Sequence, residues 1–167
     1  MLLDLTVQGW LEELGERGPA PGGGSAAAVT AAMAAALVAM AARLSADSWA
    51  DAAGFSAQTA ALRDRLAALA QADADDYAES LRILENPEAI PAERRDRVLA
   101  SALDRAAQTP LLIAETAGDV ATLAYQARER VEPKVQADVE AAVALAAEGY
   151  EPDPALVEAL RARFRSS

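Results

Sequence analysis

Cysteine and histidine are both absent from this chain of 167 residues. Without cysteine there is no disulfide, no thiolate zinc site and no cysteine nucleophile. Without histidine the chain lacks the commonest general base and metal ligand, so acid–base chemistry falls to Asp, Glu, Tyr, Lys or Arg. We therefore expect no metal centre.

Positive charge is also scarce, because 15 Lys and Arg residues accompany 26 Asp and Glu residues and leave a net charge of -11. The only lysine is Lys134. A protein that follows nucleic-acid phosphates needs a cationic face, so we expect no nucleic-acid partner. Anionic small molecules can still bind to an acidic protein through arginines or helix N-termini.

Aromatic residues make up only 4% of the chain, although 53% of its residues are hydrophobic. The core must therefore consist of Ala, Leu and Val, which pack closely where backbones approach each other, as between helices. No segment shows the two-residue alternation of a half-buried strand. At this length we expect one domain spanning residues 1–167, an all-α bundle of about five to seven helices.

Apolar spacing, capping residues and helix breakers place the expected helices. The first helix has apolar residues at i, i+3, i+4 and i+7 from Val7 and ends at the segment RGPAPGGG. Pro91 and Pro110 each suit the first turn of a helix, which separates a fourth helix from a fifth. The expected helices are 6–16, 25–45, 56–84, 91–108, one beginning at Pro110, 133–147 and 154–165.

The helix expected at 25–45 consists almost entirely of small apolar residues and carries no charge before Arg43. A helix that is apolar on all sides is normally buried on all sides, and a second subunit would supply the missing cover. We therefore predict a homodimer. The large side chains of this helix form one stripe, made of Val29, Met33, Leu37, Met40 and Leu44.

The same helix has the length of a membrane span. Alanine is only weakly lipophilic, however, and the flanking residues carry no aromatic belt or basic cluster, so we expect no membrane insertion. The N-terminal segment has no basic region before an apolar core, which argues against a signal peptide. We expect a cytoplasmic location.

Three glycines, Gly22 to Gly24, stand directly before this helix, and Ser25 can act as its N-cap by accepting a hydrogen bond from a backbone N–H. In one interpretation the glycines form a sharp turn at φ values that other residues avoid. In the other, exposed N–H groups and the helix dipole form a cradle for an anion or a polar ring. The segment fits neither GxxxxGKS/T nor a GxGxxG that follows a strand, so a nucleotide-binding loop is not indicated.

One aspartate stands out in the segment AQADADDYAESL. Asp73 and Tyr77 are i and i+4 neighbours on an apolar helix face, whereas Asp75 and Asp76 project elsewhere and are expected to be solvated. A buried carboxylate costs several kcal/mol unless it is paired, so Asp73 is either a chemical group or a hydrogen-bond partner of another helix or of Tyr77. Arg95 belongs to an arginine-rich, mostly solvated face that offers one partner for a core acid.

The segment PAPGGGSAAAVTAAMAAALVAMAARLS resembles the signature of the cyclodeaminase/cyclohydrolase family, Pro-x-Pro-Gly-Gly-Gly-Ser followed by a small-residue helix. The segment DADDYAESL is similar to the family's Asp-x-x-x-Phe/Tyr segment, with Asp73 and Tyr77 at the aspartate and the aromatic. The segment RRDRVLASALDRAAQTPLLIAE resembles an arginine-containing helix that ends in Ala-x-x-x-Pro, with Pro110 at the proline. QADVEAAVALAAEGY resembles a later segment with Asp138 at its acid, so the resemblance covers about residues 1–150 and leaves 151–167 divergent.

The resemblance implies an all-helical homodimer that binds tetrahydrofolate derivatives near the subunit interface, with no further cofactor and no metal. It implies closure of 5-formiminotetrahydrofolate to 5,10-methenyltetrahydrofolate with loss of ammonia, or hydration of the methenyl compound to 10-formyltetrahydrofolate. Asp73 would then be the catalytic residue. The implied substrate-binding residues are Pro21, Gly22, Gly23, Gly24, Ser25, Tyr77, Arg95 and Asp138.

The chain departs from the family pattern at two places. The segment ILENPEAIP lacks the lysine of the family's Leu-Pro-Lys turn, and GYEPDPALVEALRARFRSS has none of the asparagines of the family's closing segment. Two alternatives therefore stay open. One is a non-catalytic dimeric relative that binds a folate or another small molecule, and the other is a helical scaffold whose basic C-terminal helix binds a protein partner.

Overall fold

The computed structural model describes residues 1–18 and 20–147. Its α-helices are α1 (Val7–Gly15), α2 (Gly23–Leu44), α3 (Ala52–Glu85), α4 (Ala92–Ala127) and α5 (Gln136–Ala147). Short 3-10 helices occupy Leu2–Asp4, Pro87–Ala89 and Pro133–Val135. The described residues contain no strand, so the predicted all-α class is confirmed. The helix predicted at 154–165 lies outside the described residues.

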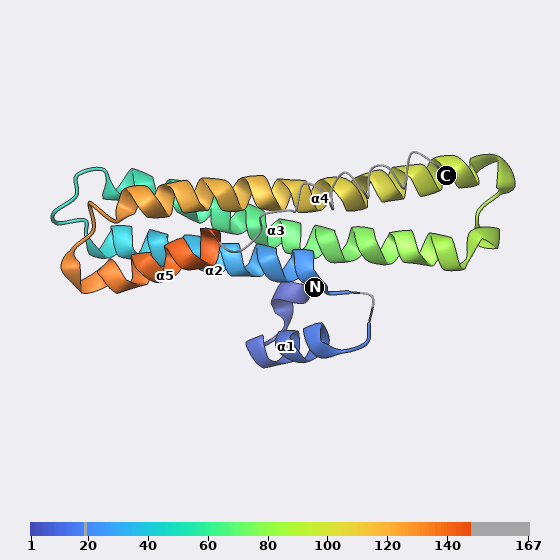
Figure 1. The fold of residues 1–167 in the computed structure, drawn as a ribbon, viewed down its shortest axis with the longest axis horizontal. Helices are drawn as coiled ribbons and strands as arrows, with labels where there is room; N and C mark the ends of the chain where they lie inside the picture. Colours follow the sequence, from blue (N-terminus) through green and yellow to red (C-terminus); the bar gives the residue numbers. More distant parts are fainter. Residues whose placement is uncertain (19, 148–167) are drawn as a thin grey trace.

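The two longest helices, α3 and α4, run antiparallel along the length of the molecule (Figure 1). Both α2 and α5 lie beside one half of this pair. As a result, α2 begins against the body of α3 and α4 and not at an end of the bundle (Figure 1). This offset places the glycine turn before α2 beside the middle of two continuous helices.

The core depends on alanine, as its low aromatic content predicts. Along α2, Ala31, Ala34 and Ala35 are fully buried, as is Val38, and the two largest fully buried side chains are Leu66 of α3 and Ile113 of α4. Small side chains let the backbone of α2 approach α3, α4 and α5, all of which it contacts. Tight packing of alanine faces is therefore what joins the helices.

The stripe of large side chains on α2 is only partly covered within one chain: Val29 and Leu37 pack against the core, and complete cover would need the second subunit that the sequence predicts. Met33 is 50% exposed and Leu44 is 48% exposed. The alanine faces take close contacts because backbones approach closely where side chains are small, and Met33 and Leu44 lie where α2 is exposed. By length and composition α2 could cross a membrane, but 50% of its most apolar window is buried inside the molecule.

Helix α4 continues through Pro110, so the predicted boundary between a helix at 91–108 and one beginning at Pro110 is wrong. Proline has no N–H for the carbonyl of residue i-4, and inside a helix it costs about 3 kcal/mol or more. Tertiary packing overrides this local cost, because Thr109 and Ile113 on either side of the proline are buried against the other helices.

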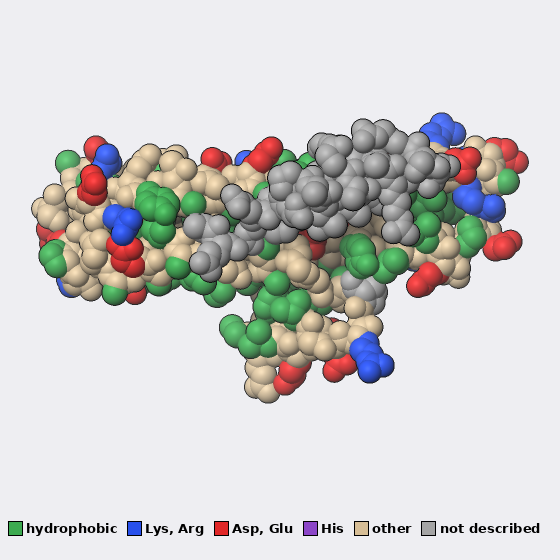
Figure 2. Space-filling model, viewed as in Figure 1, with side chains coloured by type: hydrophobic (Ala, Val, Ile, Leu, Met, Phe, Trp, Pro, Cys, Tyr) green, Lys and Arg blue, Asp and Glu red, His purple; other side chains and the backbone are tan. Residues whose placement is uncertain are grey.

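In the N-terminal arm, residues 1–18, the 3-10 helix Leu2–Asp4 contacts α3, and α1 stands off the bundle (Figure 1). Thr6 caps α1 by accepting a hydrogen bond from the N–H of Gly9, and the N–H of Leu2 donates to Gln71 Oε1 of α3 at 2.6 Å. None of the residues of α1 is fully buried, and Val7 is 78% exposed. Figure 2 shows hydrophobic side chains gathered where this arm meets the bundle.

Substitution Ala34→Leu should destabilise the protein by about 1–3 kcal/mol, because three extra carbon atoms must enter a site with no exposed surface. The matched control Met33→Leu, at the neighbouring half-exposed position, should change the free energy of unfolding by no more than about 0.5 kcal/mol. Urea unfolding followed by circular dichroism measures both. Equal stability of the two variants would contradict the close packing of the alanine face.

Candidate active site

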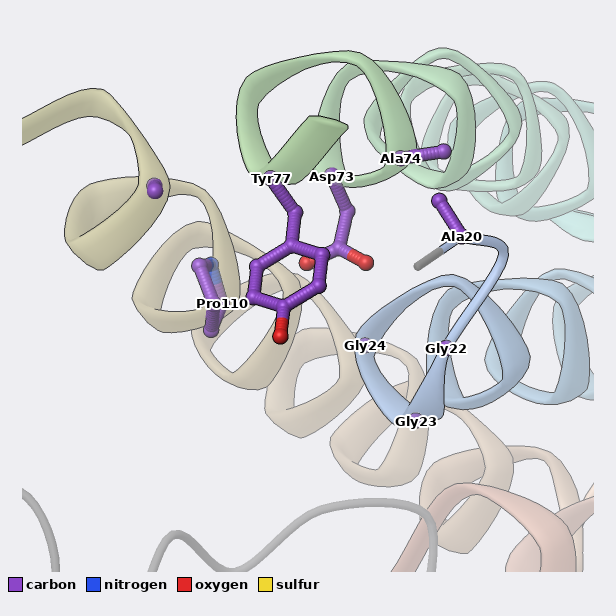
Figure 3. Close-up of a pocket in the computed structure, with 9 residues that line it drawn as sticks. Ala20, Gly22, Gly23, Gly24, Asp73, Ala74, Tyr77 and Pro110 are labelled. Atoms are coloured by element: carbon purple, nitrogen blue, oxygen red, sulfur yellow. The ribbon is translucent and has the colours of Figure 1, made fainter. Parts of the chain in front are cut away.

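A cavity of about 340 Å³ opens where α2 begins. Its walls come from three sides: the glycine turn Gly22–Gly24 with Ala20, then Asp73, Ala74 and Tyr77 of α3, and finally Ala106 and Pro110 of α4 (Figure 3). A volume of this size lies within the range of small-molecule sites. The sequence separates these three groups by up to ninety residues, and only the bundle brings them together.

Gly24 of α2 lies directly against the Asp73 side chain of α3. A Cβ atom built on this residue would lie 2.6 Å from Cγ of Asp73 and 2.7 Å from its Oδ2, well inside van der Waals contact. Gly22 and Gly23, in contrast, have nothing within 4 Å of an added Cβ. Gly24 is therefore required for the contact between the helices, whereas the two preceding glycines leave the cavity open.

The interpretation of the glycines as a turn with unusual φ values is wrong for the described residues, since none of their glycines has a positive φ. Gly22 is extended, with φ at -128° and ψ at -160°, and serves as the N-cap of α2 without a side chain. The peptide bond between Ala20 and Pro21 is cis. The glycines are explained by space for neighbouring groups and not by backbone conformation.

Ser25 has a different role from the N-cap expected of it. It is the third residue of α2 and fully buried, and its Oγ lies 2.9 Å from Asp73 Oδ2 and 3.0 Å from the carbonyl oxygen of Ala70. A hydroxyl has one proton, so it donates to one of these acceptors at a time. Ser25 is within hydrogen-bonding distance of the Asp73 carboxylate but does not line the cavity.

Asp73 is partly buried at the cavity wall with its two oxygens in different surroundings. Oδ2 accepts the bond from Ser25, and Oδ1 has no hydrogen-bond partner within residues 1–18 and 20–147. The N–H groups of the first turn of α2 have no acceptor inside the helix, so the carboxylate lies at the positive end of a helix dipole. Tyr77, 49% exposed, projects from the next turn of α3 toward the glycine turn and Pro110 (Figure 3).

Asp76 was expected to be solvated, and this expectation is wrong. Its Oδ2 accepts a hydrogen bond from Thr109 Oγ1 at 2.8 Å, and its Oδ1 accepts one from Arg105 Nε at 3.2 Å. Hydrogen bonds to Asp76 and then to Glu79 raise the pKa of the Arg105 guanidinium above its ordinary value. This network joins α3 to α4 directly beside the cavity and sets which residues of α4 face Asp73. Asp75 is exposed, as expected, and accepts from Gln71 Nε2.

The structure brings together Gly22, Gly23, Gly24, Asp73 and Tyr77 from the predicted set. Pro21 is buried beside this group without lining the cavity, as is Ser25.

Arg95 and Asp138 lie away from the cavity. Arg95 is in the first turn of α4, where its Nη2 donates to the carbonyl oxygen of Ile90, and it precedes Pro110 by about 22 Å along the helix. Asp138 is in the first turn of α5.

The sequence did not indicate the lining residues Ala20, Ala74 and Ala106, because an alanine side chain has no reactive or polar group that would mark it as part of a site. Across the described part of the chain no group of three or more acidic residues is arranged to hold a metal ion.

The protein is an all-α helical bundle with a carboxylate beside the N-terminus of a small-residue helix. The family model described as formiminotransferase-cyclodeaminase matches residues 6–158, and the chain belongs to this family. The chain is similar to the mouse formimidoyltransferase-cyclodeaminase, with 35% identity over 127 residues, which are 69% of this chain and 23% of the mouse protein. It therefore spans less than a quarter of the length of this curated relative.

The fold is also that of a solved structure, formiminotetrahydrofolate cyclodeaminase from Thermotoga maritima. The TM-score is 0.79 at 21% sequence identity, and the match covers 98% of this chain and 81% of the other. At this identity the likeness shows a shared fold.

Substitution Gly24→Ala should destabilise the protein by about 1–3 kcal/mol, because the new methyl group overlaps the Asp73 carboxylate. The matched control is Gly23→Ala, where the methyl group meets open space and alanine raises helix propensity by up to about 1 kcal/mol. Thermal unfolding of both variants tests the contact. If Gly24→Ala is as stable as Gly23→Ala, α2 and α3 are not in contact at this residue.

Proposed function

We propose that the protein acts on a tetrahydrofolate derivative bound in the cavity between the start of α2, α3 and α4. The reaction is closure of 5-formiminotetrahydrofolate with loss of ammonia, or hydration of 5,10-methenyltetrahydrofolate. Family membership and the names of the two relatives support the substrate class. The observation that carries the proposal is the Asp73 carboxylate at the cavity wall, with one oxygen held by Ser25 and the other free of protein partners in the described residues.

Both reactions pass through a tetrahedral carbon between N5 and N10, so proton transfer at nitrogen is the task of the catalyst. In ring closure N10 attacks the carbon of the protonated formimino group, Asp73 accepts the N10 proton and returns it to the departing –NH2 group, and the carbon–nitrogen bond breaks to release ammonia and leave the methenyl cation. In hydration Asp73 accepts a proton from the attacking water and delivers it to N5 as the N5–carbon bond breaks, and the remaining hydroxyl proton passes to solvent as the formyl C=O forms. One carboxylate with one free oxygen suffices for either sequence.

The rest of the cavity suits binding of such a ligand. The backbone of Gly22 and Gly23 is open to a close approach, since no Cβ obstructs it. Tyr77 offers a half-exposed aromatic ring on which a flat heterocycle or a benzoyl ring can stack.

A binding function without turnover is the second candidate. The cavity is lined by only two ionisable side chains, Asp73 and Tyr77, since Arg95 and Asp138 lie elsewhere in the described structure. A cavity with a single carboxylate can retain a ligand without catalysing a reaction, so turnover and affinity must be measured separately.

Substitution Asp73→Asn should lower kcat by about 10²- to 10⁴-fold and affect KM less, because the amide keeps the size of the side chain and loses its basicity. Absorbance of the methenyl compound follows the reaction, and titration with a reduced folate measures affinity. Asp75→Asn is the matched control, an exposed aspartate on the same helix whose change should leave kcat unaltered.

Three outcomes separate the candidates. Turnover that depends on Asp73 supports the enzyme, and folate binding without turnover supports the binding function. A wild-type protein that neither turns over nor binds any reduced folate contradicts both.

We further propose that two chains associate through the large side chains of α2. Met33 and Leu44 are half-exposed on an apolar helix, and burial of such side chains against a second copy removes apolar surface from water. A dimer would cover the face that one chain leaves open.

Sedimentation velocity should give the mass of two chains for the wild-type protein, and Met33→Glu should shift the population toward single chains by placing a charge in the interface. The control is Leu84→Glu, a substitution at a 52% exposed leucine near the end of α3. A wild-type mass of one chain at micromolar concentration would contradict the proposal.

A further inference from the structure

The carbonyl group of Ala106 lacks its usual helical partner. In an α-helix this oxygen accepts a hydrogen bond from the N–H of the fourth following residue, which here is Pro110 and has no N–H. The adjacent side chains are engaged elsewhere: Thr109 Oγ1 donates to Asp76, and Arg105 donates to Asp76, Glu79 and Ser101. None of the side-chain hydrogen bonds within residues 1–18 and 20–147 ends on this oxygen.

Ala106 and Pro110 are also the two residues of α4 that line the cavity. Figure 3 shows Pro110 on α4 beside Tyr77 of α3. A helical carbonyl points along the axis toward the residue four positions later. The oxygen of Ala106 therefore lies between two residues that both face the cavity. The helix therefore loses one backbone hydrogen bond on a face of α4 that lines the cavity.

We propose that Pro110 serves to expose the Ala106 carbonyl as a hydrogen-bond acceptor for an N–H donor of the ligand. The cavity then offers acceptors on two walls, the Asp73 carboxylate from α3 and the Ala106 carbonyl from α4. The ligand class that fits is a flat group with N–H donors on two edges, such as an aminopyrimidinone or an amidine. The assignment of this group to the pterin ring of a folate rests on the proposed function. The assignment of the Ala106 carbonyl as a hydrogen-bond acceptor does not depend on that function.

The first experiment compares Pro110→Ala and Pro110→Val, both of which restore the N–H, while valine also keeps three side-chain carbon atoms. The probe is 5-formyltetrahydrofolate, a stable reduced folate, with affinity measured by calorimetry. Both variants should raise Tm by about 5 °C or more, because the helix regains a hydrogen bond. Both should also bind the probe about tenfold more weakly, because the acceptor is now occupied.

The exposed residue Gln108 provides the control, and Gln108→Ala should change neither Tm nor affinity. If Pro110→Val binds the probe as tightly as the wild type and only Pro110→Ala is weakened, contact with the proline ring explains the effect. The proposal is then overturned. Unchanged Tm in both variants would overturn it as well, because the oxygen would already have a partner.

A second measurement does not depend on folate. The carbonyl carbon of Ala106 is observed by NMR through the N–H of Ala107, in the wild type and in Pro110→Val, and each protein is titrated with methylguanidinium as an N–H donor. The signal should move in the wild type and stay fixed in the variant. A wild-type signal that methylguanidinium does not move overturns the inference. If the signal moves but no reduced folate binds, the proposed function fails and the acceptor site stands.

Discussion

The contact between Gly24 and the Asp73 carboxylate is the constraint on which the site depends. A methyl group does not fit between the two residues, so the start of α2 lies directly on α3. The next residue, Ser25, is consequently buried with its hydroxyl on Asp73 Oδ2, and the carboxylate is held at the positive end of α2. Gly24 leaves space for the Asp73 carboxylate, and Ser25 donates a hydrogen bond to it.

The offset of α2 along the bundle turns this contact into a cavity. Because α3 and α4 continue past the first residue of α2, the glycine turn meets the sides of two helices (Figure 1). Asp76, Arg105 and Thr109 then set the register of α4 on α3, and with it the position of Pro110 opposite Asp73. A proline that is unfavourable for the helix thus lies where α4 lines a ligand-sized cavity.

Several predictions from the sequence were right because they depended on local or compositional properties. The all-α class and the start of α1 after Thr6 follow from composition, apolar spacing and capping. The grouping of the three glycines with Asp73 and Tyr77 came from the family resemblance, and the cavity contains all five residues. Predictions failed where contacts between helices decide the outcome. Pro110 was taken as a helix start, Ser25 as a cap and Asp76 as solvated, and each assignment was overturned by a partner distant in the chain.

By itself the sequence determined that the protein is built of helices with an alanine-rich core, since the spacing of apolar residues and the size of each side chain are properties of the sequence. It also determined the chemical groups available, a set without cysteine or histidine. Only the tertiary structure decided that the alanine faces of α2 are buried while Met33 and Leu44 remain half-exposed. It alone decided that Asp73, the glycine turn and Pro110 surround one cavity. The physical reason is that the offset and register of one helix against another arise from packing between side chains far apart in the sequence. A local sequence pattern does not predict this packing.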